Sequence, residues 1–301
     1  MKILLTGAFN WKKEYLKIMQ ESGHDIIMIS REDAPLNDEH YKVDAVVCNW
    51  LFVHHNISDF PNLNYIQLLS AGMDRVPLDY IKEKSIVIHN ARGVYSIPMA
   101  EYAVSAVLQL YKNSYEFHSN QKKHIWKKNR NLKELSGKRV CVVGTGSVGS
   151  EVGRLFSVFT PEIYGVDLYP YESEYFKHIY PIDCLDEQLS LSDVVVVTLP
   201  LTDETRNIFD EHRFSVMKDQ SVFVNIARGG LVDEKALLDA LDRKLFGAAS
   251  DVFVEEPLSE ESLLWDKPNL IISPHNSFVS ENNEDRMWNL IYNNLRSYGN
   301  G

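Results

Sequence analysis

Residues 138–153 read KRVCVVGTGSVGSEVG, and this stretch decides the fold expected for the rest of the chain. The apolar run Val140–Val143 predicts a buried strand, and it leads directly into Gly144–Gly149, a turn with the spacing G-x-G-x-x-G. A periodic apolar segment with Val152 and Leu155 follows and predicts a helix. The order strand, glycine-rich turn, helix is the context in which this spacing predicts a dinucleotide site.

Each glycine of the turn is expected for a separate structural reason. Gly144 permits a tight turn, Gly146 lets the backbone approach a pyrophosphate at the helix N-terminus, and Gly149 lets the helix pack closely on the strand. The alternative is an ordinary strand-to-helix turn without a ligand. If the turn binds a dinucleotide, all of it contacts the cofactor: Gly144, Thr145, Gly146, Ser147, Val148 and Gly149.

An acidic residue lies at the position where a dinucleotide-binding motif requires one. The apolar run Ile163–Val166 ends in Asp167, and 167 − 144 = 23 residues separate it from Gly144. A carboxylate about 20 residues after the first glycine accepts hydrogen bonds from the adenosine ribose and repels a 2′-phosphate. The sequence therefore predicts NAD as the cofactor.

The composition of the chain predicts an ordinary globular protein of about two domains. It has 301 residues, of which 45% are apolar and 24% charged, and its formal net charge is −11. This acidity argues against a nucleic-acid partner, because a surface that binds phosphates is basic. The three cysteines offer no disulfide framework or metal spacing, and no apolar run approaches the roughly 18 residues of a membrane span. We therefore expect a cytoplasmic protein with no metal, no nucleic-acid partner and no membrane partner.

Strands alternate with helices along the chain, and this order predicts parallel sheets. Five predicted strands fall in a first unit, at 2–6, 25–30, 43–48, 63–69 and 86–88, and no phosphate-binding turn follows any of them. A long helix opens at residue 97 with Pro98 in its first turn and extends to about Tyr115. The polar, basic segment 117–135 is expected to be irregular, and an amphipathic helix at 281–296 closes the chain.

Three polar residues follow strands of the second predicted sheet, which includes residues 193–199, 221–226 and 270–272. They are Arg228, Glu256 and His275. In open parallel sheets, ligands bind beyond the carboxyl ends of the strands, so these side chains could line one crevice. Taken singly, Arg228 could lie in a surface turn, Glu256 could form a solvated acid pair with Glu255, and His275 could be structural.

Together the three side chains provide the chemistry of hydride transfer to a 2-oxo acid. An arginine grips a carboxylate through two parallel hydrogen bonds and can polarise the neighbouring ketone. An imidazolium can donate a proton to the developing alkoxide, and a paired carboxylate favours that charged ring and fixes its orientation. We therefore assign Arg228 as the carboxylate anchor, His275 as the acid/base and Glu256 as the residue that orients His275.

Longer motifs around these residues resemble the D-isomer-specific 2-hydroxyacid dehydrogenase family, and the resemblance covers nearly the whole chain. The motifs are LLSAGMDRV and NARGVYSIPMAEYAV in the first half, and VVGTGSVGSEVG, NIARGGLVDEKAL, SDVFVEEPL and ISPHNSF in the second. The resemblance implies an α/β fold of two Rossmann-like parallel-sheet domains. A flavodoxin-like substrate domain would contain residues 1–97 plus 278–301, and a doubly wound NAD-binding domain would contain residues 98–277. It also implies a homodimer that forms through the cofactor domain, near Tyr102 to Trp126.

The resemblance implies roles for further residues. The backbone N–H groups of Ala71 and Gly72 would hold the substrate carboxylate, and Asp251 would lie near the nicotinamide carboxamide. The segment after Asp167 lacks the basic residues that NADP-preferring members carry, which again favours NAD. The remaining cofactor contacts would be Leu199, Pro200, Thr205, Ile226 and Ala227.

Bulky residues are expected at the floor of the substrate pocket, although each could equally be plain core: Trp50, Phe52, Met73, Tyr95, Met99 and Trp126. Such a lining favours a small or apolar 2-oxo acid. A phosphorylated substrate, as in phosphoglycerate oxidation, would need cations at the pocket, and Arg75 and Arg92 are the candidates. The alternative to an enzyme is an NAD(H)-sensing binding protein of the co-repressor kind.

Overall fold

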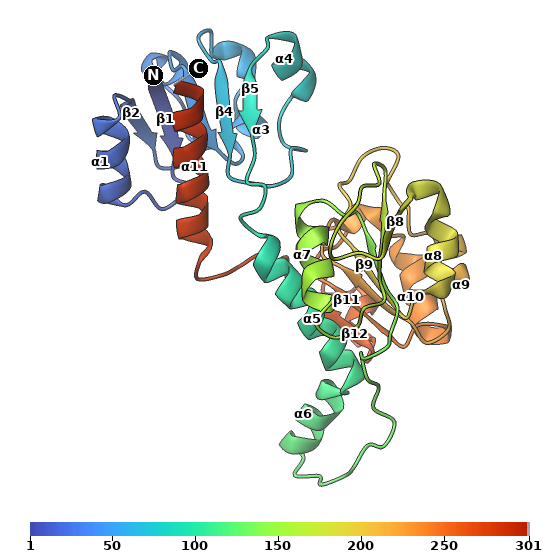
Figure 1. The fold of residues 1–301 in the computed structure, drawn as a ribbon. Coiled ribbons are helices and arrows are strands. Elements are labelled where there is room, and N and C mark those ends of the chain that lie inside the picture. Colours follow the sequence, from blue (N-terminus) through green and yellow to red (C-terminus); the bar gives the residue numbers. More distant parts are fainter. Residues whose placement is uncertain (300–301) are drawn as a thin grey trace. The chain divides into compact units, whose positions relative to one another are not determined.

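The computed structural model describes residues 1–299 and divides the chain into two compact units (Figure 1). Unit 1 contains Met1–Tyr95 and the chain from Ser280 onward, and unit 2 contains Ser96–Val279. Asn300 and Gly301, which were expected in the substrate domain, lie outside the described residues.

Unit 1 is built on a five-stranded parallel sheet with the strand order β2-β1-β3-β4-β5. β1 pairs with β2 on one side and with β3 on the other, which is the flavodoxin-like order, and it confirms the predicted fold of this unit. The strands are β1 (Lys2–Thr6), β2 (Asp25–Ile29), β3 (Ala45–Cys48), β4 (Tyr65–Leu68) and β5 (Val87–His89). The helices between them are α1 (Lys13–Glu21), α2 (Asp38–Tyr41), α3 (Leu51–His54) and α4 (Leu78–Glu83).

Helices cover both faces of this sheet. On one face, α1 and the closing helix α11 (Asn283–Gly299) pack on side chains of β1 and β3, and Figure 1 shows α11 in red along the sheet. Trp288 of α11 stacks on Tyr15 of α1 with their ring centroids 4.2 Å apart. The other face packs against α3 and α4 through a cluster that includes Leu51 and Ile81. The closing helix therefore belongs to the core of the first unit.

Unit 2 is built on a seven-stranded parallel sheet with the order β12-β11-β10-β9-β6-β7-β8. Counted from β8, six of these strands follow the 3-2-1-4-5-6 order of the doubly wound dinucleotide-binding fold, and β12 adds a seventh. The predicted fold of the second unit is therefore confirmed. The strands are β6 (Val140–Val143), β7 (Ile163–Asp167), β8 (His178–Pro181), β9 (Val194–Val197), β10 (Val222–Asn225), β11 (Gly247–Ser250) and β12 (Leu270–Ile272). The helices are α5 (Ser96–Tyr111), α6 (Ser114–Lys122), α7 (Ser147–Phe156), α8 (Leu185–Leu191), α9 (Glu211–Val216) and α10 (Glu234–Arg243).

The central strands of this sheet are continuous apolar runs because both of their faces are buried. Every residue of β6 and β9 is fully buried, and burial of each valine contributes about 1.5–3 kcal/mol. One face packs on α5 and α7, and the other packs on α8, α9 and α10. The chain switches sides between β6 and β9, so the turns after these two strands leave the sheet side by side.

The connection between the predicted domains differs from the expectation. The long helix ends at Tyr111 rather than near Tyr115, because Asn113 adopts a left-handed backbone conformation with φ 51°. A second helix, α6, then extends into the segment that was expected to be irregular, and Figure 1 shows it projecting from the body of unit 2. The strand β8 and the helices α8 and α9 were not predicted from the sequence. Within residues 1–299, no helix is both long enough and apolar enough to cross a membrane.

Candidate active site

The glycine-rich turn follows β6 and meets the turn that follows β9. Gly144 has φ +93°, and a Cβ atom on it would lie 2.8 Å from the backbone nitrogen of Leu199. A Cβ atom on Gly149 would lie 1.9 Å from the carbonyl oxygen of Gly144. Both positions therefore require glycine, because any side chain would force the helix away from the turn. A Cβ atom on Gly146 would meet no atom within 4 Å, so this face of the turn is open.

The open face of the turn is also the N-terminus of α7. Gly146 is the N-cap residue of this helix, and the first N–H groups of a helix have no acceptor within it. Here those groups belong to Ser147, Val148 and Gly149. Together with the helix dipole they suit the pyrophosphate of a dinucleotide. The residues present therefore fit the predicted cofactor.

Asp167 ends β7 and is bound to the glycine-rich turn itself. Its Oδ2 accepts hydrogen bonds from the backbone N–H of Thr145 at 2.6 Å and from the Thr145 hydroxyl at 3.0 Å. Its Oδ1 accepts from the N–H of Tyr169 at 3.1 Å. Each carboxylate oxygen can accept two hydrogen bonds, so Oδ1 keeps capacity for a ribose hydroxyl. The carboxylate is thus fixed beside the turn, where the dinucleotide motif requires it.

Tyr171 supports the same turn, although this role was not predicted from the sequence. Its hydroxyl donates to the carbonyl oxygen of Thr145 at 2.7 Å and lies 2.9 Å from the hydroxyl of Ser150 on α7. Tyr171 therefore bridges the turn and the helix. The segment that carries it, residues 168–171, reads LYPY and contains no cation that would attract a 2′-phosphate.

The predicted cofactor contacts after β9 and β10 flank the turn, because β9 lies between β6 and β10. Leu199, Ile226 and Ala227 are buried in the core of unit 2. The Thr205 hydroxyl donates to the carbonyl oxygen of Pro200 at 2.7 Å and closes the loop between these two residues. These five residues therefore lie in the segments that follow β9 and β10, and the backbone of Leu199 meets Gly144.

His275 and Glu256 form a direct pair. Nδ1 of His275 lies 2.7 Å from Oε2 of Glu256, and Oε1 of the same carboxylate accepts the N–H of Phe253 at 2.9 Å. His275 has φ +50°, and its own N–H donates to the carbonyl oxygen of Asp251 at 2.8 Å. Residues other than glycine are uncommon in this left-handed region and cluster at functional sites. Nε2 of His275 has no hydrogen-bond partner within residues 1–299, so it is the ring nitrogen that can exchange a proton.

Asp251 is fully buried and fastens the loop that follows β12. Its Oδ1 accepts from the Ser273 hydroxyl at 2.5 Å and from the N–H of Asn276 at 2.7 Å, and its Oδ2 accepts from the N–H of Ser277 at 2.9 Å. Oγ of Ser273 also lies 2.7 Å from the Tyr102 hydroxyl. Because Ser273 has one hydroxyl proton and a carboxylate only accepts, Ser273 donates to Asp251 and Tyr102 donates to Ser273. Burial raises the pKa of the Tyr102 hydroxyl above its ordinary value.

Arg228 follows β10 and is linked to the histidine–glutamate pair through the backbone. A Cβ atom on Gly229 would lie 1.9 Å from the carbonyl carbon of Phe253, so the Arg228 loop touches the segment that carries Glu256. Arg228 is half-buried, and its Nη1 donates to the carbonyl oxygen of the preceding residue at 2.8 Å. The structure therefore gathers Arg228, Glu256 and His275 at the carboxyl ends of the neighbouring strands β10, β11 and β12.

Two predicted substrate contacts, Ala71 and Gly72, lie in the turn after β4 of unit 1. The Asn90 side chain donates to the carbonyl oxygen of Ala71 at 2.6 Å, and the Ser70 hydroxyl donates to that of Gly72 at 2.8 Å. Within the described chain, the N–H groups of Ala71 and Gly72 have no acceptor. This turn therefore has two backbone donors that could bind a ligand.

The aromatic residues expected at the substrate pocket lie in different places. Trp50 follows β3 and is 43% exposed. The Tyr95 hydroxyl donates to the carbonyl oxygen of Leu69 at 2.6 Å, and burial raises its pKa to about 12. Trp126 follows α6 in unit 2 and is 98% exposed, so it lines no pocket of that unit. Across the described residues, no three His, Cys, Asp or Glu side chains are grouped to hold a metal ion.

One further polar residue at a sheet edge was missed. Glu32 lies buried shortly after β2, beyond the carboxyl end of a parallel strand. The rule that located Arg228 and His275 was therefore a sufficient signal for Glu32.

Comparison with known proteins reveals relatives of this chain. The model of the family described as D-isomer specific 2-hydroxyacid dehydrogenase, NAD binding domain, matches residues 104–277. D-3-phosphoglycerate dehydrogenase of Methanocaldococcus jannaschii is 30% identical over 286 residues, which are 93% of this chain and 54% of that protein. The chain thus spans about half the length of that relative. Glyoxylate/hydroxypyruvate reductase A of Arabidopsis thaliana is 31% identical over 250 residues, which are 81% of this chain and 78% of that protein.

A solved structure extends this similarity. D-lactate dehydrogenase of Aquifex aeolicus, complexed with NAD and lactic acid, matches this chain with a TM-score of 0.81 and 25% identity. The match covers 99% of this chain and 96% of that one. Similarity to proteins of this kind therefore extends over nearly all of the sequence.

Proposed function

Because this chain belongs to the D-isomer specific 2-hydroxyacid dehydrogenase family, we propose that it interconverts a D-2-hydroxy acid and a 2-oxo acid by hydride transfer. The family, the class of NAD(P)-dependent oxidoreductases and the two-sheet α/β fold were predicted from the sequence and are confirmed. The substrate and the roles of single residues belong to the proposal. The observation that carries it is the His275–Glu256 pair, at the same sheet edge as a turn that fits a dinucleotide.

His275 is the acid/base in this proposal. During reduction its Nε2 donates a proton to the ketone oxygen, and during oxidation the same atom takes a proton from the hydroxyl. Glu256 accepts a hydrogen bond from the Nδ1–H group of His275. It thereby selects the tautomer that is protonated on Nδ1, and its charge stabilises the imidazolium. The N–H of Phe253 on the second carboxylate oxygen keeps Glu256 in place.

Arg228 anchors the substrate carboxylate. Its planar guanidinium matches the two carboxylate oxygens, and its fixed charge also stabilises the oxygen that becomes an alkoxide. The N–H groups of Ala71 and Gly72 are proposed as further donors to that carboxylate, with Trp50 and Tyr95 beside the substrate. Unit 1 is thus proposed as the substrate domain and unit 2 as the cofactor domain.

When bound, the nicotinamide of NAD supplies or accepts the hydride. The turn Gly144–Gly149 would hold the pyrophosphate, and Asp167 would bind the adenosine ribose. The remaining proposed contacts with the cofactor are Leu199, Pro200, Thr205, Ile226, Ala227 and Asp251. Asp251 would contribute to cofactor binding through the loop after β12, which its hydrogen bonds hold in place.

Oxidation of NADH with a panel of 2-oxo acids tests the proposal: glyoxylate, pyruvate, hydroxypyruvate and longer acids. We expect at least one acid to turn over, and His275→Ala to lower kcat by about 100- to 10,000-fold. The matched control is His212→Ala, because His212 also lies beside a carboxylate, 3.0 Å from Asp186, at an exposed part of unit 2. The proposal fails if no acid is reduced, or if His275→Ala and His212→Ala behave alike.

We propose NAD rather than NADP as the preferred cofactor. Asp167 places a negative charge beside the turn, and residues 168–171 add no cation to offset it. Asp167→Ala should therefore narrow the difference between the dissociation constants for NADH and NADPH. A wild-type protein that binds NADPH more tightly than NADH would contradict this choice.

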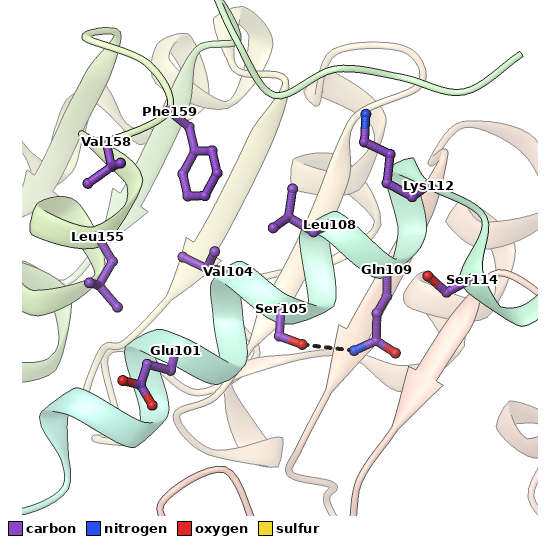
Figure 2. Close-up of a pocket in the computed structure, with 10 residues that line it drawn as sticks. All are labelled: Glu101, Val104, Ser105, Leu108, Gln109, Lys112, Ser114, Leu155, Val158 and Phe159. Carbon is purple, nitrogen blue, oxygen red and sulfur yellow. Dashed lines mark hydrogen bonds between the residues drawn. The ribbon is translucent and has the colours of Figure 1, made fainter.

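We propose that the chain forms a homodimer through an apolar groove of unit 2. Figure 2 shows Val104 and Leu108 of α5 on one side of this groove and Leu155 of α7 and Phe159 on the other, and its volume is about 550 Å³. Exposed apolar side chains continue on α6 and the nearby loops: Tyr115, Phe117, Ile125, Trp126 and Val158. Exposed apolar surface of this extent is typical of protein interfaces.

Light scattering tests the homodimer. Leu108→Asp should produce monomers, because a carboxylate would be buried without a partner in the interface. The control is Leu78→Asp, at an exposed leucine of unit 1, which should stay dimeric. A monomeric wild-type protein would refute the proposal.

A cytoplasmic location remains a prediction from composition, and cell fractionation tests it.

A further inference from the structure

The peptide group between Thr145 and Gly146, in the middle of the glycine-rich turn, is held by two hydroxyl groups. The Tyr171 hydroxyl donates to the carbonyl oxygen of Thr145 at 2.7 Å, and the Ser150 hydroxyl donates to the same oxygen at 2.9 Å. A carbonyl oxygen has two lone pairs, so the two hydroxyls together satisfy it. The proposed function assigns a role to neither Tyr171 nor Ser150.

The other groups of Thr145 are fixed as well. Its N–H and its hydroxyl donate to Asp167, and the residue is only 1% exposed. Its methyl group packs on Gly165 of β7, where a Cβ atom would lie 2.5 Å from Cγ2 of the threonine. The side chain and the N–H of Thr145 therefore stay in place, and only its carbonyl group can reorient.

Gly146 leaves this carbonyl group able to turn unless something holds it. A flip of the peptide group changes ψ of Thr145 and φ of Gly146, and glycine adopts positive and negative φ about equally readily. In the structure Gly146 has φ −62° and ψ −158°. A Cβ atom on Gly146 would meet no atom within 4 Å, so no packing at this residue restrains the flip. The hydrogen bonds from Tyr171 and Ser150 are therefore the contacts that oppose it.

The direction of the carbonyl group decides the direction of the N–H that follows it. A trans peptide is planar, and its C=O and N–H bonds point to opposite sides. Because Tyr171 and Ser150 hold the carbonyl oxygen of Thr145, the N–H of Gly146 points away from these two hydroxyls. Within residues 1–299 this N–H has no hydrogen-bond acceptor, and it lies directly before the first N–H groups of α7. It can therefore join them in binding an anion.

We propose that Tyr171 and Ser150 are positioning residues of the cofactor site, and that they hold the peptide group in the orientation that presents the N–H of Gly146 to the pyrophosphate. The inference rests on the proposed function, in which NAD lies at this turn. A flipped peptide would present the carbonyl oxygen of Thr145 in place of the N–H. An oxygen there would repel a phosphate, whereas successive N–H groups attract it. Tyr171 lies outside the G-x-G-x-x-G spacing, so the motif alone does not contain this restraint.

The two hydroxyls should act cooperatively on the affinity for the cofactor, which titration of nicotinamide fluorescence measures. The apparent Kd equals the intrinsic Kd divided by the fraction of the protein whose peptide group has the binding orientation. While one hydroxyl remains, most of the protein keeps this orientation, so Tyr171→Phe and Ser150→Ala should each raise the Kd for NADH only about 2- to 5-fold. The double variant loses both hydrogen bonds and should raise the Kd about 30- to 100-fold, which exceeds the product of the single effects.

Matched controls and two further ligands separate this role from general support of the fold. Tyr164→Phe removes a hydroxyl that donates to Glu162, and Ser157→Ala removes one that donates to the carbonyl oxygen of Arg154. Both variants should leave the Kd for NADH unchanged, because neither hydroxyl reaches the turn. ADP-ribose contains the pyrophosphate and should follow NADH in every variant, whereas adenosine lacks it and should bind equally to all of them.

Single effects that simply multiply in the double variant would overturn the inference, because the two hydroxyls would then act independently. A double variant that binds NADH as tightly as the wild-type protein, or an equal loss of affinity for adenosine and ADP-ribose, would overturn it as well. If the double variant does not fold, the contrast between adenosine and ADP-ribose in the two single variants decides the question. A wild-type protein that does not bind NADH would instead contradict the proposed function, so the two failures are distinct.

Discussion

Nδ1 of His275 lies 2.7 Å from Oε2 of Glu256, and Oε1 of the same carboxylate holds the N–H of Phe253. The glutamate is thus clamped between a ring and a backbone donor, and it cannot rotate without breaking one of these hydrogen bonds. The left-handed backbone of His275, with φ +50°, costs about 1 kcal/mol or more. Such a conformation persists only where the surroundings determine it, and here the hydrogen bonds of Asp251 fasten the loop.

Glu256→Gln should lower kcat by about 10- to 1,000-fold while KM changes little. The amide can still contact the ring, but it has no charge to stabilise an imidazolium and can favour the wrong tautomer. Steady-state kinetics with the best 2-oxo acid of the panel measures the effect. Glu255→Gln is the control, because Glu255 is the exposed neighbour and makes no contact with His275 among the described residues. Equal losses in both variants would show that Glu256 acts through overall charge rather than through the pair.

Replacement of two glycines of the turn by alanine, one at a time, should distinguish an effect on stability from an effect on cofactor binding. Gly149→Ala would bring its Cβ atom within 1.9 Å of the Gly144 carbonyl oxygen, so we expect the Tm to fall by about 5–15 °C. Gly146→Ala meets no atom of the protein and should leave the Tm within about 2 °C, yet raise the Kd for NADH about 10-fold.

Thermal unfolding and titration of nicotinamide fluorescence measure the two effects. The contrast arises because Gly149 is required by the protein's own packing, whereas Gly146 borders open space into which a pyrophosphate fits. If Gly146→Ala binds NADH as tightly as the wild-type protein, the pyrophosphate does not lie at this turn.

The loop that carries His275 depends on the hydrogen bond between Ser273 and Asp251. Ser273→Ala removes a donor from a fully buried carboxylate, so the free energy of unfolding should fall by about 1–3 kcal/mol. Tyr102→Phe removes only the outer hydrogen bond of the chain and should cost about 0.5–1.5 kcal/mol. Guanidinium denaturation measures both values. A larger loss for Tyr102→Phe than for Ser273→Ala would mean that the tyrosine, and not the carboxylate, determines the loop.

The sheets were predictable because their strands carry a strong local signal. β6 and β9 are buried on both faces, so they appear in the sequence as unbroken valine-rich runs. α6 was not predictable in this way, because SYEFHSNQK has no apolar stripe and none of its residues is buried. Its start depends on the left-handed conformation of Asn113, which no pattern of apolar residues reveals.

The positions of residues at strand ends were equally predictable from the sequence, but the partners of their side chains were not. The order of the strands predicted that Arg228, Glu256 and His275 share an edge. The three hydrogen bonds of Glu32 join segments that are 26, 17 and 18 residues away, so no local pattern shows them. Likewise the bulk of Trp50 was visible in the sequence, and the Arg75 guanidinium that lies over its ring was not.

The three cysteines should differ sharply in their reactivity. Burial raises the pKa of the Cys141 thiol to about 12 and that of the Cys48 thiol well above its ordinary value, whereas Cys184 is half-buried. A thiol reacts as its thiolate, whose fraction falls about tenfold for each pH unit below the pKa. At pH 8 the Cys141 thiol is therefore protonated, and closed packing excludes a reagent as well. We expect iodoacetamide at pH 8 to alkylate Cys184 alone in the native protein and all three cysteines in guanidinium, as measured by peptide mass spectrometry. Native alkylation of Cys141 at the rate of Cys184 would show that β6 opens to solvent, which would contradict a fully buried strand leading into the glycine-rich turn.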